Sequence, residues 1–180
     1  MEYEFRGPGV QKKPQKRRER SRAKNPERPL RAAGGTSRSR SLVQLFAAVV
    51  GAVFLLGGIL GFIPGATTDY DQLSLIGPDS QAKLLGLFEV SVVRNIVHLA
   101  FGVAGLLAAT RASASVGFLV GGGILYAVVF VYGILVEQGS DLDLLPVNDA
   151  DNILHLGLSL GMILLGVIGA ALLRREPARA

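Results

Sequence analysis

The sequence predicts an all-α fold, an integral membrane four-helix bundle built as two duplicated helical hairpins and preceded by a disordered basic tail. Three observations predict it. Of the 180 residues, 49% are hydrophobic, and they gather into four runs that approach or exceed the roughly 18 apolar residues of a bilayer-spanning helix. The basic residues are concentrated near one end of the chain. A short polar motif occurs twice, in the second and fourth runs.

Residues 1–41 form a strongly basic segment. They contain 13 of the 19 Lys and Arg residues but only 4 of the 14 acidic ones. The segment lacks an apolar cluster that could offset the entropy of ordering it, so we expect a disordered cytoplasmic tail. Such a tail can set the orientation of a membrane protein and bind anionic lipid head groups. Nucleic acid is not expected as its partner.

Four apolar runs follow the tail, separated by turns and charged loops. The first ends at Pro64-Gly65, a sequence that stops a helix. The second is the most polar, because Arg94, Asn95 and His98 lie in its first two turns. We expect transmembrane helices at residues 42–62, 92–110, 116–136 and 152–173, with a loop at residues 65–90 and a short cytoplasmic tail at residues 174–180.

The distribution of charge predicts how these helices cross the bilayer. After residue 41 the chain holds 6 basic and 10 acidic residues. The basic ones lie mostly on the side of the tail, at Arg111, Arg174, Arg175 and Arg179, whereas the acidic ones lie mostly in the loops of the other side. By the positive-inside rule, we expect a multi-pass membrane protein with both termini in the cytoplasm.

A repeated motif links the second and fourth runs. Residues 95–99 read Asn-Ile-Val-His-Leu and residues 152–156 read Asn-Ile-Leu-His-Leu, and each Asn follows a Val by five positions. The first and third runs share a weaker Gly-Ile-Leu at residues 58–60 and 133–135. The two histidines of the chain are both in the motif. We therefore predict two hairpins related by duplication, in parallel orientation.

The motif also supplies the candidate site. Asn and His at positions i and i+3 share a helix face, and both copies lie near the extracytoplasmic start of a helix. The predicted polar or ligand site consists of Asn95, His98, Asn152 and His155.

A second group of residues near the same helix starts forms a candidate ion pair. Asp151 can cap the fourth helix. The repeat places Arg94 at the equivalent position of the second helix, where a cation opposes the helix dipole. Arg94 is therefore expected to pair with a carboxylate, either Asp151 or Glu89.

Several stretches resemble one known family. They are GILGFIPGATTDYDQL, AKLLGLFEVSVVRNIVHLAFGVAGL, GGGILYAVVFVYGILVEQ and PVNDADNILHLGLSLGM. They resemble small four-helix bacterial membrane proteins, most common in actinobacteria and catalogued as a domain of unknown function (DUF4383 type). The resemblance spans residues 42–173 and implies the same four-span topology. It implies no activity.

Three functions are compatible with these observations. The first is a structural or accessory membrane component in which Asn and His side chains join helices. The second is small-molecule or ion binding or transport at the Asn-His motif. The third is a redox protein with His98 and His155 as axial ligands of a b-type haem. We expect no enzyme activity, no catalytic residue and no metal-ion site, and a homo-oligomer or another membrane protein as partner.

Overall fold

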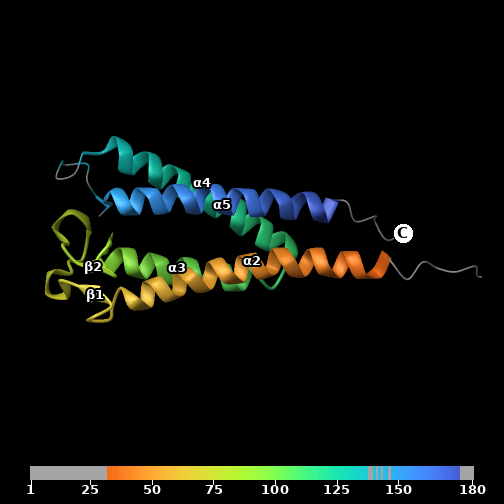
Figure 1. Cartoon of the computed structure of the whole chain (residues 1–180), viewed down its shortest axis with the longest axis horizontal. Coiled ribbons are helices and arrows are strands. Elements are labelled where there is room, and N and C mark those ends of the chain that lie inside the picture. The colour runs from red at the N-terminus through yellow and green to blue at the C-terminus, as the bar shows by residue number, and fades with distance from the viewer. Residues whose placement is uncertain (1–31, 138–139, 141, 143, 146, 175–180) are drawn as a thin grey trace, which may run out of the picture. The chain divides into compact units, whose positions relative to one another are not determined.

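The computed structural model describes residues 32–137, 140, 142, 144, 145 and 147–174. Four helices account for most of them (Figure 1): α2 Ala32–Leu60, α3 Val92–Ala108, α4 Ala112–Leu135 and α5 Asp149–Arg174. Three segments are long and apolar enough to cross a membrane, namely Leu42–Leu60, Ala112–Leu135 and Asp149–Arg174. The fourth helix, α3, is apolar but has only 17 residues.

The first helix begins earlier than the sequence predicted. It starts at Ala32 rather than at residue 42, so the last ten residues of the expected tail, residues 32–41, are helical. Extending an existing helix is easier than nucleating a new one, and the apolar run that follows supplies the nucleus. The rest of the expected tail, residues 1–31, and most of the expected C-terminal tail, residues 175–180, lie outside the described residues.

Side-chain caps fix the starts of α3 and α5. The Oγ atom of Ser91 accepts a hydrogen bond from the backbone N–H of Arg94 at 3.2 Å. The Oδ1 atom of Asn148 accepts one from the backbone N–H of Asp151 at 3.0 Å. Each cap satisfies an amide that the first turn of a helix leaves without an intrahelical partner.

The connection between α2 and α3, predicted as an irregular loop, contains a small antiparallel sheet. Its strands are β1 Thr67–Thr68, β2 Lys83–Leu84 and β3 Phe88–Glu89, in the order β1-β2-β3. Two 3-10 turns, η1 Tyr70–Gln72 and η2 Gly77–Asp79, lie between β1 and β2. Between β2 and β3 the chain reverses through Leu85 and Gly86, which both have positive φ. Strand β3 ends just before α3 and so places Glu89 beside the start of that helix.

Glycines let the helices pack as two close pairs. A Cβ atom on Gly51 of α2 would lie 2.8 Å from the backbone nitrogen of Leu106 of α3. On α4, a Cβ atom on Gly123 would lie 2.9 Å from the backbone nitrogen of Ile163 of α5. The helix backbones are thus in direct contact, the usual packing of helices in lipid. We call α2 with α3 the first hairpin, and α4 with α5 the second hairpin.

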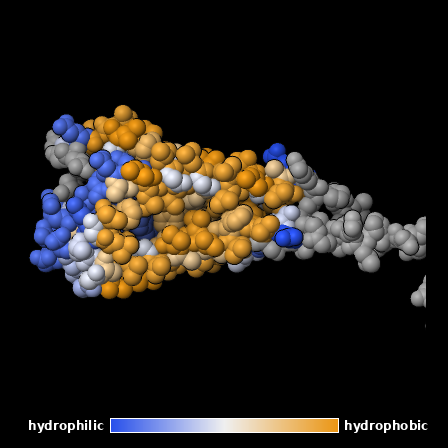
Figure 2. Space-filling view, viewed as in Figure 1, coloured by the Kyte–Doolittle hydropathy of each residue, from blue (hydrophilic) through white to orange (hydrophobic). Residues whose placement is uncertain are grey.

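Buried side chains from three helices join the two hairpins. The core cluster comprises Val43, Ala47, Phe54, Leu119, Tyr126 and Met162. The surface is the reverse of that of a water-soluble protein, because many large apolar side chains are exposed along the helices. Figure 2 shows this apolar surface along the helices and hydrophilic residues at the end where the strands lie. The described helices thus have the surface expected of a membrane protein.

The close contact at Gly123 can be tested against a glycine on the same helix. A Cβ atom on Gly121 would meet no neighbouring side chain or helix within 4 Å, so Gly121 serves as the matched control. We expect Gly123→Ala to lower the free energy of unfolding by about 1–3 kcal/mol, because the new methyl group meets backbone atoms. Gly121→Ala should leave it unchanged or raise it by up to about 1 kcal/mol. Unfolding in detergent measures the free energy of both variants. Equal changes in the two variants would contradict the packing described.

Candidate functional site

The two hairpins make the same contacts at matching positions. Corresponding residues of α2 and α4 are 72 positions apart (51 to 123, 54 to 126, 61 to 133), and those of α3 and α5 are 57 positions apart (95 to 152, 98 to 155, 106 to 163). The glycine contacts of the two hairpins are related by these two spacings. Gly51 faces the backbone of Gly102 and Leu106, and Gly123 faces that of Ser159 and Ile163.

The two asparagines of the motif lie inside the hairpins. Asn95 is fully buried against α2, where a Cβ atom on Gly61 would overlap its amide group. Asn152 donates a hydrogen bond from Nδ2 to the carbonyl oxygen of Gly133 of α4, at 3.0 Å. The Oδ1 and Nδ2 atoms of Asn95 have no hydrogen-bond partner among the described residues. Asn152 therefore joins α4 and α5 by a hydrogen bond, whereas Asn95 only packs beside Gly61.

The two histidines lie where the hairpins meet. The ring of His98 packs on that of Phe54, and the ring of His155 on that of Tyr126, each with centroids 5.4 Å apart. The rings of Phe54 and Tyr126 also contact each other, with their centroids 5.2 Å apart. Phe54 and Tyr126 are corresponding residues, and so are the two histidines. The contact between the hairpins is thus built from matching positions.

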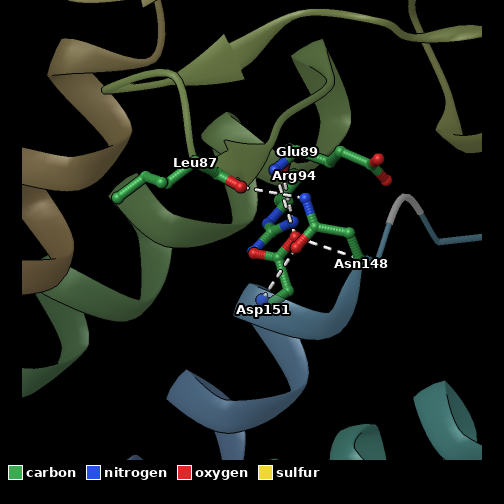
Figure 3. A network of polar contacts seen from close by, with 5 residues as sticks. All are labelled: Leu87, Glu89, Arg94, Asn148 and Asp151. Carbon is green, nitrogen blue, oxygen red and sulfur yellow. Dashed lines mark hydrogen bonds and ion pairs between the residues drawn. The ribbon is translucent and has the colours of Figure 1, made fainter.

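The polar residues that precede the histidines join the hairpins directly (Figure 3). Arg94 of α3 forms an ion pair with Asp151 of α5, and the carboxylate of Asp151 is fully buried. The guanidinium of Arg94 also donates to the backbone carbonyl oxygen of Glu89. Arg94 and Asp151 are corresponding residues of the two hairpins. We call this ion pair and the hydrogen bonds around it the polar lock.

The second carboxylate oxygen of Asp151 completes the polar lock. It accepts hydrogen bonds from the backbone N–H groups of Glu89, at 3.0 Å, and Asn148, at 3.2 Å. The Nδ2 atom of Asn148 donates to the carbonyl oxygen of Leu87 at 2.9 Å. One carboxylate therefore connects β3, the start of α3 and the start of α5. A buried charge is tolerated when it is paired and hydrogen-bonded in this way.

Glu89 contributes its backbone to the polar lock, whereas its carboxylate points away from Arg94 in Figure 3. The pKa of that carboxyl group is raised above its ordinary value of 4.5, first by partial burial and then by the nearby charge of Asp151. Of the two carboxylates considered as partners for Arg94, Asp151 makes the ion pair.

Two cavities, of about 200 and 240 Å³, lie beside the histidines. Arg94, His98, Tyr126 and His155 line both of them. Of the four predicted site residues, the two histidines therefore reach these cavities, whereas the two asparagines pack within the hairpins. No group of three or more His, Cys, Asp or Glu side chains that could hold a metal ion occurs among the described residues.

Sequence reasoning missed three contributors to this region: Phe54, Tyr126 and Asn148. Phe54 and Tyr126 are 72 positions apart, as are Gly51 and Gly123. Aligning the first and third runs on these glycines, rather than on the Gly-Ile-Leu pattern, would have brought the two aromatic rings together. Asn148 occupies the position in its hairpin that Ser91 occupies in the other, and both residue types favour helix starts.

The polar lock can be tested by removing one charge. We expect Asp151→Asn to lower the free energy of unfolding by about 3–5 kcal/mol, because the charge of Arg94 then lies largely buried without its counter-charge. Asp149→Asn is the matched control, since Asp149 lies in the same first turn of α5 but is exposed. Its effect should not exceed about 1 kcal/mol. Unfolding in detergent measures both, and similar losses would contradict the role assigned to Asp151.

The raised pKa of Glu89 predicts a pH effect of defined sign. A carboxyl group whose pKa is higher in the folded state stabilises that state while it is protonated, and this stabilisation is lost as the pH rises through the folded pKa. We therefore expect Glu89→Gln to raise the melting temperature slightly at neutral pH. The difference from the wild-type protein should shrink as the pH approaches 4.5, the ordinary value of the group. A lower melting temperature for the variant at neutral pH would contradict this account.

Comparison with known proteins identifies one family. Residues 44–168 match the family described as Domain of unknown function (DUF4383). Neither a curated protein nor a solved structure matches the chain. The matched segment runs from within α2 to within α5 and includes the motif of both hairpins and the polar lock. Since it covers well over half of the sequence, the chain belongs to this family of unknown function.

Proposed function

We propose that this chain is a non-enzymatic accessory component of a bacterial plasma membrane, a four-helix bundle that crosses the bilayer four times with both termini in the cytoplasm. The polar lock carries the proposal. Its charges and hydrogen bonds are used to hold the hairpins together. This use of polar side chains is typical of a structural role in lipid.

The length and packing of α3 support a fourth crossing. Its 17 residues span about 25 Å at 1.5 Å per residue, which is near the lower limit for a transmembrane helix. Most of α3 packs against the end of α2 and the residue after it, from Gly51 to Gly61. Four crossings return the chain to its starting side.

The charges at the helix ends support the orientation. Arg111 lies between α3 and α4, and Arg174 ends α5. Both therefore fall at the end opposite to the strands and the polar lock. The basic segment precedes α2 in the sequence. We propose that it contacts anionic lipid head groups on the same side as Arg111 and Arg174.

The matching contacts support an origin by duplication. A parallel repeat brings corresponding residues together along the line between its two halves. Arg94 with Asp151, and Phe54 with Tyr126, are two such contacts. Chance similarity of two five-residue motifs would not also match the glycines of α2 and α4 that face α3 and α5.

The topology is tested with reporter fusions in intact cells. Fusions after Lys83 and after Asp143 should report an extracytoplasmic location, and fusions at Arg111 and Ala180 a cytoplasmic one. The expectation follows from four crossings and the positive-inside rule. A cytoplasmic signal after Lys83, or opposite locations for Arg111 and Ala180, would overturn the proposed topology.

The accessory role is tested by purification of the full chain from its native membrane in a mild detergent. An accessory component should elute with one other membrane protein in a fixed ratio. Elution of the chain alone, fully folded, would contradict the role while leaving the topology intact.

A further inference from the structure

The two cavities beside the histidines are counterparts of each other. Helices α3 and α4 line the first cavity with Val97, His98, Phe101, Leu125, Tyr126 and Val129. Helices α5 and α2 line the second cavity with Leu154, His155, Leu158, Val53, Phe54 and Gly57. Each residue of the first set has its counterpart in the second, at the spacings of 57 and 72 positions. The fold therefore forms the same kind of cavity on both sides of the line where the hairpins meet.

Apart from Ser91 in the first cavity, the polar side chains that line the cavities belong to residues that both cavities share. Both cavities are lined mainly by aliphatic and aromatic side chains. The four residues that they share are Arg94, His98, Tyr126 and His155. An apolar cavity with a few convergent polar groups is the usual form of a small-molecule site.

One of these polar groups lacks a partner. His155 is only 3% exposed, and its Nδ1 atom has no hydrogen-bond partner among the described residues. Leaving a buried imidazole nitrogen without a partner is unfavourable. The nitrogen itself is enclosed, but His155 lines both cavities, so a turn of its ring would bring the nitrogen to a ligand there.

The charges indicate which ligand would fit. The positive charge of Arg94 is already balanced by Asp151 in the polar lock. None of the described residues that line the two cavities is Asp or Glu, so a cation would find no counter-charge there. An uncharged ligand is therefore favoured. A hydroxyl group both donates and accepts, so it can pair with a neutral imidazole nitrogen in either tautomer.

We propose that these cavities bind a small uncharged molecule with an apolar body and one hydroxyl group, which hydrogen-bonds to His155. The volumes of about 200 and 240 Å³ exceed the roughly 150 Å³ of a cavity that holds benzene. A substituted ring or a short branched chain therefore fits. The molecule can come from the bilayer, as a lipid with one free hydroxyl group, or from solution, as a small alcohol. This binding site does not depend on the accessory role.

The test uses two photoreactive probes that differ in one group. Para-azidobenzyl alcohol, with a single ring, carries the hydroxyl, and para-azidoethylbenzene replaces it with a methyl group. The full chain is placed in phosphatidylcholine nanodiscs, irradiated with each probe and analysed by mass spectrometry of the labelled peptides. We expect the hydroxyl probe to label cavity residues about fivefold more than the ethyl probe, as one hydrogen bond of about 1 kcal/mol implies. Equal labelling by the two probes would overturn the proposal.

Substitution of the histidine tests the proposed contact. His155→Phe keeps a ring but removes both nitrogens. Labelling by the hydroxyl probe should fall to the level of the ethyl probe. Retention of the fivefold difference in a folded His155→Phe variant would overturn the proposal.

Two pairs of matched variants test the cavities without changing the polar groups. Val97 lines the first cavity and Ile96 lines neither, yet both are 53% exposed. Leu154 lines the second cavity and Leu156 lines neither, and both are 39% exposed. We expect Val97→Trp to abolish labelling of the first cavity and Leu154→Trp that of the second. The controls Ile96→Trp and Leu156→Trp should label like wild type, and unchanged labelling in both cavity variants would overturn the proposal.

Competition identifies the source of the ligand. Geraniol, a short branched alcohol that partitions into the bilayer, represents a membrane lipid with one hydroxyl group, and benzyl alcohol represents a small molecule from solution. Suppression of labelling by the first assigns the site to lipid, and suppression by the second assigns it to a dissolved alcohol. If neither suppresses labelling, the proposed ligand class is wrong.

Discussion

The arrangement of the helices depends on one buried ion pair, between Arg94 and Asp151. It lies where two helices begin and a strand ends, and the carboxylate of Asp151 also accepts the backbone N–H groups of Glu89 and Asn148. A buried charge is tolerated only with such partners. The positions of β3, α3 and α5 are therefore coupled, since moving any one of them would leave a charge or an amide without its partner. The sheet fixes that end of the structure because one of its residues supplies both an N–H and a carbonyl oxygen to the pair.

The two helices of each hairpin also approach closely further along their length. In lipid there is little hydrophobic drive between helices, so contact between backbones must supply the attraction. Gly51 and Gly123 provide that contact within each hairpin. Between the hairpins, aromatic rings contact each other, as Phe54 does with Tyr126, and glycines again allow close approach, as Gly169 of α5 does beside Val43 of α2.

The sequence predicted the four helices, but not the small sheet or the aromatic contact between the hairpins. Long apolar runs are a strong signal, and the predicted spans overlap all four helices. The sequence left Asp151 and Glu89 as alternative partners for Arg94, and the structure pairs it with Asp151. Two-residue strands such as Phe88–Glu89 carry no periodicity that a pattern could reveal. The aromatic contact was missed because α2 and α4 follow a spacing of 72 positions and α3 and α5 a spacing of 57. The difference reflects the longer connection within the first hairpin, so no single repeat length aligns the whole chain.

The proposed duplication explains why this contact is made by different residues. Two identical hairpins related by a twofold axis would place each residue near the axis against its own copy. At the position of the polar lock that would oppose Arg to Arg or Asp to Asp, and a buried pair of like charges is strongly unfavourable. Joining both hairpins in one chain allows the two positions to differ, so that one became Arg94 and the other Asp151. For the same reason, the rings of Phe54 and Tyr126 can differ, and only Tyr126 carries a hydroxyl group. The two hairpins therefore have similar contacts between their own helices. They differ in charge and polarity at the residues where they contact each other.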